Sequence, residues 1–136
     1  MADNHWARFT QSSLLAARSI SAANPNDDGT GTYADLVSGI TTGRLITAIG
    51  AKARGSTSAG RLKFILNRNA TLFVLPITLV VPLRTIAAGA PNIPPWQEII
   101  DLTNLGLVLS ATTDKIQVAT HNGEAFDVTA FGGDFV

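Results

Sequence analysis

The sequence predicts an all-β protein: a single-domain antiparallel β-sandwich with jelly-roll or Greek-key-like connections and an extended N-terminal arm. Short runs with apolar residues at every second position recur from about residue 14 to the C-terminal end, and no helical period persists. Clusters of Gly, Asn and Pro separate these runs at intervals of roughly ten residues, which is typical of a two-sheet sandwich. Several connections are too long for hairpins, so crossings between sheets are expected instead of a simple meander.

Eight or nine segments are expected as strands. Near the C-terminal end, Asn122-Gly123 separates two alternating runs, which predicts a β-hairpin with a type I′ turn. The loop at residues 55–60 is too short for a crossover helix, which predicts that the strands on either side of it pair with each other. The expected strands cover residues 14–23, 33–37, 44–54, 62–66, 71–81, 96–102 (or a short helical turn there), 105–109, 116–118 and 126–130.

The N-terminal residues, 1–12, are expected to form the arm, and residues 13–136 the sandwich. The arm has little periodicity but carries Trp6 and Phe9, two large apolar side chains that are unfavourable in water. An aromatic pair of this kind is suited to anchor in a pocket of a neighbouring molecule. Packing against an edge of the chain's own sheet is the alternative.

Length and composition fit one domain with its own core. The 136 residues are 46% hydrophobic but only 15% charged, and ten Lys and Arg residues balance ten Asp and Glu residues. Because a chain without net charge lacks the field that attracts phosphate backbones or anionic lipids, we expect no nucleic-acid or membrane partner. The absence of cysteine excludes disulfides and thiolate chemistry. Residues 1–9 lack the apolar core of a signal peptide, so we expect a soluble protein that is not exported.

The run at residues 71–81 is apolar on both faces, whereas a strand in a two-layer sandwich buries only one. Pro76 interrupts the run and indicates a bulge or an edge position, because proline cannot donate a ladder hydrogen bond. Burial of four such side chains is worth about 6–12 kcal/mol before the cost of association, which favours an oligomer. Cover by the chain's own arm or by the Pro-rich loop at residues 93–96 is the alternative. The candidate oligomer-interface residues are Leu72, Phe73, Val74, Leu75, Ile77, Leu79, Val80 and Val81.

Basic residues cluster between residues 44 and 68, and two paired strands could present them on one face of a sheet. Three interpretations stay open: a solvated sheet face, a surface that docks onto an acidic protein, and a nucleic-acid surface. The last is the weakest, because no aromatic residues are interleaved with the basic ones.

No catalytic constellation is apparent in the sequence. His5 and His121 are the only histidines, and neither lies in a motif, so we expect no enzyme and no small-molecule substrate. Residues 24–29, together with Asp35, loosely resemble a calcium loop. They lack its first Asp, its final Glu and its flanking helices, so a turn is the better interpretation. We expect no cofactor.

The pattern of residues 27–32, 49–62, 106–110 and 126–135 resembles that of a family of small structural proteins of tailed bacteriophages and prophages, the capsid decoration or cement proteins. The similarity covers most of residues 27–135 and carries over no individual functional residue. It implies a homotrimer of β-sandwich subunits on the phage head that clamps neighbouring major capsid proteins. It also implies a virion protein made in the cytoplasm of the host bacterium.

Under this resemblance, the arm and the basic strand pair are the expected contacts with the capsid. These residues are Trp6, Phe9, Arg44, Lys52, Arg54, Arg61 and Lys63.

Three functions are consistent with these features of the sequence. The first is a non-enzymatic cement protein on the capsid surface. The second is another virion component, a tail, head-tail connector or fibre module, which would also be all-β and oligomeric. The third is a carbohydrate-binding or glycan-hydrolysing sandwich. Its candidate residues are Trp6, Tyr33 and Trp96 for binding, and Glu98 with Asp101 as the carboxylate pair for hydrolysis.

Overall fold

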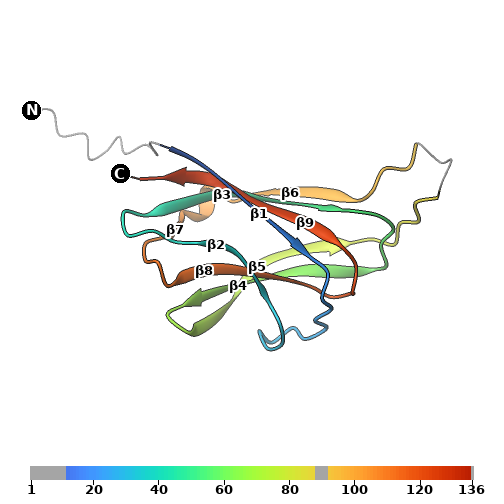
Figure 1. Cartoon of the computed structure of the whole chain (residues 1–136), viewed down its shortest axis with the longest axis horizontal. Coiled ribbons are helices and arrows are strands. Elements are labelled where there is room, and N and C mark those ends of the chain that lie inside the picture. The colour runs from blue at the N-terminus through green and yellow to red at the C-terminus, as the bar shows by residue number, and fades with distance from the viewer. Residues whose placement is uncertain (1–11, 88–91, 136) are drawn as a thin grey trace, which may run out of the picture.

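The chain forms two antiparallel β-sheets that pack face to face, which confirms the predicted all-β sandwich (Figure 1). The computed structural model describes residues 12–87 and 92–135. The first sheet contains, in spatial order, β1 (Ser12–Ile20), β9 (Phe126–Asp134), β3 (Arg44–Ala53) and β6 (Gln97–Asp101). The second sheet contains β2 (Ala34–Ser38), β8 (Asp114–Thr120), β4 (Gly60–Arg68) and β5 (Thr71–Val81). A 3-10 turn, η1 (Thr103–Leu105), leads into the short β7 (Leu107–Leu109), which pairs with the start of β3.

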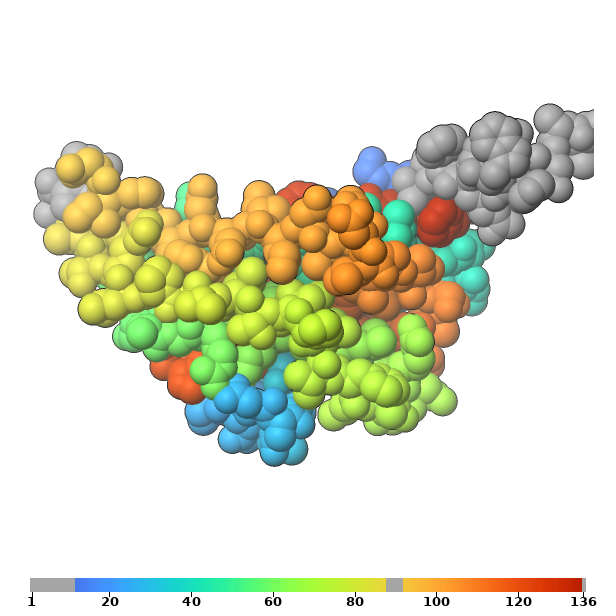
Figure 2. Space-filling view, turned by 180° about the vertical axis from the view of Figure 1, so that it is seen from behind, coloured from blue at the N-terminus to red at the C-terminus, as the bar shows by residue number. Residues whose placement is uncertain are grey.

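The strand pairs are nested along the chain. β1 pairs with β9, β2 with β8, β3 with β6, and β4 with β5, all antiparallel. The first four strands alternate between the two sheets, so the predicted crossings are present. As a result, edge strands β1 and β2 lie on one side of the sandwich, and β6 and β5 lie on the other, where they are neighbours in Figure 2.

Alternating side chains from both sheets fill one core. Phe64 of β4 and Phe126 of β9 are the largest fully buried side chains. On β3, a bulge between Ile46 and Ala48 shifts the alternation, so that Ile46 and Ile49 both face the core. The backbone of β9 approaches β3 closely at this bulge. A side chain at Gly132 would collide with the carbonyl oxygen of the residue before Ile46, which explains the glycine there.

Two predicted strand pairings are wrong. β8 and β9, on either side of Asn122-Gly123, lie in different sheets, so the predicted hairpin does not form. β3 and β4, on either side of the loop at residues 54–59, also lie in different sheets. Because stacked sheets are only about 10 Å apart, a short loop can cross between them as readily as it can close a hairpin.

The type I′ hairpin is instead the connection between β4 and β5. Asn69 and Ala70 form a two-residue loop between the paired residues Arg68 and Thr71, and both have positive φ, 51° and 69°. The Asn67 side-chain oxygen accepts a hydrogen bond from the Ala70 backbone N–H at 3.0 Å. This turn sets the register of β5 against β4.

Pro76 lies at the kind of position that its missing N–H predicts, on an edge strand and at a bulge. β5 is the edge strand of the second sheet, and its register against β4 shifts between Lys63 and Ile65, opposite Pro76. The proline therefore occupies both an edge position and a bulge, where its missing N–H costs no ladder hydrogen bond.

We expect Ala70→Gly to raise the free energy of unfolding by about 0.5–1 kcal/mol. Glycine relieves the left-handed strain of an L-residue, which outweighs its larger entropy loss on folding. Urea denaturation measures the change. Ala125→Gly, at an exposed loop position without positive φ, is the matched control and should not stabilise the protein. Equal effects of the two substitutions would contradict the assigned turn.

Candidate functional site

An apolar edge runs along β5. Leu72, Phe73, Val74 and Val80 have exposed fractions between 48% and 70%, and we call these four residues the apolar edge. β5 is also the outermost strand of its sheet, so one side of its backbone has no strand partner within the described chain. Figure 2 shows β5 (yellow-green) beside β6 (orange) on this face of the molecule. Exposed apolar side chains and one free side of an edge strand thus occur together on β5, which makes the apolar edge a candidate contact surface.

Only part of the predicted oligomer interface is exposed. Ile77, Leu79 and Val81 are at most 3% exposed and belong to the subunit's own core, and Leu75 is half-buried against it. Ile77, Leu79 and Val81 are therefore corrected from interface to core residues, and Leu75 is only partly accessible for an interface. The reason is the alternation of β5, in which every second side chain points between the sheets.

The Pro-rich loop at residues 93–96 does not cover the apolar edge. Trp96 turns into the core, where its ring packs edge-on against Phe126 with centroids 5.9 Å apart. Ile93 is itself 43% exposed. The expected arm, including Trp6 and Phe9, lies outside the described residues.

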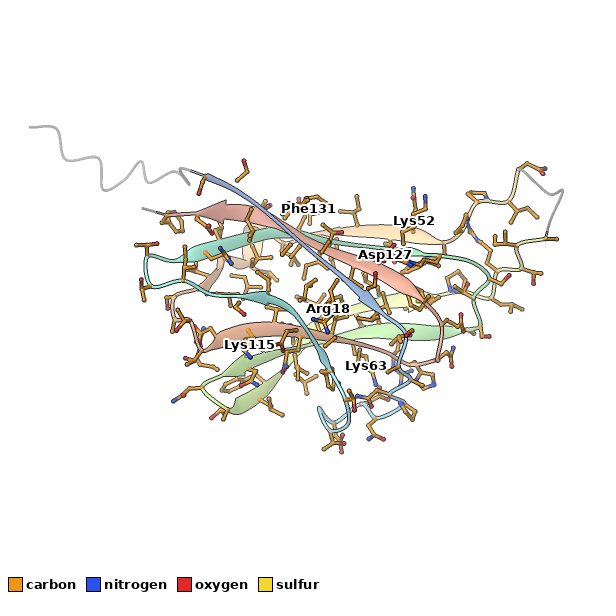
Figure 3. The ribbon with its side chains drawn as sticks, viewed as in Figure 1. Arg18, Lys52, Lys63, Lys115, Asp127 and Phe131 are labelled. Carbon is orange, nitrogen blue, oxygen red and sulfur yellow. The ribbon has the colours of Figure 1, made fainter. Side chains whose placement is uncertain are left out.

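The predicted basic face does not form. Because β3 and β4 belong to different sheets, Arg44, Lys52 and Arg54 lie on one sheet, and Arg61 and Lys63 lie on the other. Figure 3 shows this separation for Lys52 and Lys63. The expectation that two paired strands would present all of these cations together is therefore wrong.

Most of the basic residues are also neutralised by a carboxylate. Arg44 binds Asp134 through two hydrogen bonds, Nε to Oδ1 at 2.7 Å and Nη2 to Oδ2 at 3.0 Å, and these hold the pKa of Asp134 below its ordinary value. Arg54 does the same to the pKa of Asp127, with Nη2 at 2.9 Å from Oδ1. Further ion pairs are Arg61–Asp27, Arg68–Asp114 and Lys115–Asp35. A surface neutralised in this way has no concentrated positive field for an acidic partner.

Lys63 is buried beneath the loop that follows β1. The loop at residues 24–33 folds over the outer side of β4 and leaves Lys63 only 7% exposed. The ammonium donates hydrogen bonds to the carbonyl oxygens of Asn24, at 2.5 Å, and Asn26, and it lies 3.8 Å from Asp27. Burial lowers the pKa of Lys63. Lys63 thus binds two backbone carbonyl oxygens of the loop that resembled a calcium site, and it is corrected from a surface contact to a structural residue.

Asn24 holds this loop in place. Its side chain is buried, and its Nδ2 donates hydrogen bonds to the carbonyl oxygens of Thr30 and Thr32, both at 3.1 Å. Its Oδ1 accepts a hydrogen bond from the Asn26 backbone N–H at 3.1 Å. The Asn24 backbone N–H donates to the carbonyl oxygen of Thr120 on β8, at 2.8 Å. The loop is therefore tied both to itself and to the second sheet.

The residues predicted for a saccharide or hydrolytic site do not converge in the part of the chain that the structure describes. Trp96 is buried and Tyr33 is half-buried. Glu98 and Asp101 are three residues apart on β6, so they point to opposite faces of the strand. The Asp101 carboxylate accepts hydrogen bonds from the backbone and hydroxyl of Thr103. This pair does not form the facing carboxylates that glycoside hydrolysis uses.

No protein-family model matches the chain, and a search of the curated proteins finds no similar one. Among the residues that the structure describes, no helix is long and apolar enough to cross a membrane. Within the same residues, no group of three or more His, Asp or Glu side chains is placed to hold a metal ion.

We expect Asn24→Ala to lower the free energy of unfolding by about 1–3 kcal/mol, because it removes the three hydrogen bonds that the buried Asn24 side chain makes within the loop. Thermal or urea unfolding measures the loss. The control is Asn26→Ala, whose exposed side chain makes one hydrogen bond to the Thr30 hydroxyl and should change stability by less than about 0.5 kcal/mol. Similar losses in the two variants would show that Asn24 does not organise the loop.

Proposed function

We propose that this chain is a non-enzymatic structural protein of a virion, a capsid decoration or cement protein. In this proposal it forms a homotrimer on the phage head and stabilises contacts between major capsid proteins. The subunit associates through the apolar edge of β5. The trimeric state and the place on the head follow from the pattern resemblance, and the need for a partner follows from the exposed surface.

The apolar edge is the observation that carries the proposal. Within the described residues, a lone subunit leaves four large apolar side chains exposed to water on an edge strand that has one free side, an arrangement that favours uncontrolled strand pairing. About half of the surface of these side chains is still accessible. Covering it is worth roughly 3–6 kcal/mol before the cost of association. A closed assembly of identical subunits removes this liability.

The topology supports a virion protein. We interpret the nested pairing of the eight main strands as a jelly roll, an architecture found in viral capsid and lectin domains. Jelly rolls serve many functions, so the topology alone does not choose a capsid. Together with the apolar edge, it favours a subunit that is built to pack against other subunits.

The charge distribution supports recognition by shape and apolar contact. The basic residues expected to grip the capsid are mostly held in ion pairs with the chain's own carboxylates. Of the five predicted basic contacts, Lys52 is the one for which the described residues provide no ion pair. A contact with the major capsid protein therefore depends on apolar surface more than on charge.

Native mass spectrometry of the purified chain at micromolar concentration tests the assembly. We expect a species of three times the 14.2 kDa subunit mass. The double variant Val74→Asp with Val80→Asp should be a folded monomer, because a trimer would have to bury two unpaired carboxylates per subunit. The control Ala17→Asp adds a charge to the exposed surface of the other sheet and should leave the trimer intact.

Binding to isolated phage heads that lack the protein tests the location. Wild-type protein should bind in a copy number proportional to that of the major capsid protein. A single ring of copies at a vertex would indicate a connector or tail component instead. A wild-type chain that is only monomeric and does not bind heads would overturn the proposal.

A further inference from the structure

The outer face of the first sheet is hollowed at its centre. Gly50 of β3 lies between Thr129 of β9 and Ile99 of β6, so the middle of this row has no side chain. A hollow of about 480 Å³ opens there, within the roughly 300–1,000 Å³ usual for small-molecule sites. It lies on the sheet opposite to the one that carries the apolar edge, so the two surfaces are separate.

An aromatic ring forms part of the floor of the hollow. A Cβ atom at Gly50 would lie 3.6 Å from Cε2 of Phe131 and 3.2 Å from Cγ1 of Ile99. The Phe131 ring therefore reaches from β9 across the glycine, the arrangement in which an aromatic residue covers a glycine on a neighbouring strand. Phe131 is half-buried, so part of the ring stays accessible from the hollow.

Polar groups line the next row of the sheet. Lys52 lies between Asp127 and Gln97, which are its partners on β9 and β6 (Figure 3). The Asp127 carboxylate is held in place by Arg54, which donates at 2.9 Å, and by the Ser19 hydroxyl. A fixed carboxylate and a primary amide thus stand on one side of the aromatic floor, and the Thr129 hydroxyl lies beside it.

The charges of the hollow cancel. Arg54 neutralises Asp127, and the two remaining charged residues of the lining, Lys52 and Glu98, have opposite signs. An ionic ligand would therefore gain little from this site, whereas a neutral ligand with many hydroxyls has suitable acceptors and donors. The ligand must also present an apolar surface to Phe131 and Ile99.

We propose that this hollow binds a neutral saccharide. One sugar ring lies with its C–H face on Phe131, and its hydroxyls form hydrogen bonds with Asp127, Gln97 and Thr129. This inference does not depend on the proposed assembly. It uses residues other than those that the sequence suggested for saccharide binding.

An NMR titration of the full chain with maltose, cellobiose, lactose and diacetylchitobiose tests the site. We expect at least one of these disaccharides to cause saturable shifts in the amide resonances of Gly50, Ile99 and Thr129, with a dissociation constant on the order of 1 mM. No shift of these resonances with any of the four sugars would overturn the proposal. If the same amide resonances shift when the protein concentration is raised without sugar, the hollow is a contact between copies of the chain. That result would also overturn the proposal.

Two alanine variants test whether the Phe131 ring is the main binding surface of the hollow. Phe131→Ala should weaken binding by about tenfold or more, because it removes the stacking surface. The matched control is Leu15→Ala. Leu15 pairs with Phe131 on the same outer face and is 69% exposed, but it does not line the hollow. This control should change affinity by less than about twofold. Equal losses in both variants would contradict a site centred on Phe131.

Discussion

A strand of a two-layer sandwich can bury only one of its faces, and β5 is apolar on both. Its inward side chains Ile77, Leu79 and Val81 complete the core, whereas Leu72, Val74 and Val80 remain outside it. The position of β5 at the edge of its sheet adds an unpaired backbone to this exposed surface. The same strand therefore completes the core of the subunit and carries the surface that we propose for association.

The charged residues serve mainly the fold of the subunit. Arg44 and Arg54 are bound to carboxylates of β9, and Lys63 is enclosed by the loop that Asn24 organises. An exposed ion pair such as Arg54–Asp127 adds little stability by itself, but together these pairs leave the surface with little net field. The two surfaces that we propose for recognition differ in character: the apolar edge lies on one sheet and the hollow around Gly50 on the other. Because they lie on separate sheets, one subunit could use both at once.

Local patterns predicted the strands well and their partners poorly. The expected strand at residues 71–81 matches β5 residue for residue, and Pro76 correctly indicated an edge with a bulge. The pairings across residues 54–59 and across Asn122-Gly123 were wrong, because loops of that length also suit a crossing between stacked sheets.

Long-range pairing also explains what the sequence could not show about the candidate sites. The basic face depended on one of these wrong pairings. The hollow joins Gly50, Ile99 and Phe131 from three strands, and no local pattern brings such distant residues together.

Cryo-EM of phage heads prepared with and without this protein is the most direct test of its proposed assignment to the capsid. Additional trimeric density at the three-fold positions of the capsid, with the β5 edges buried between subunits, is the expected result. Identical maps of the two preparations would contradict it.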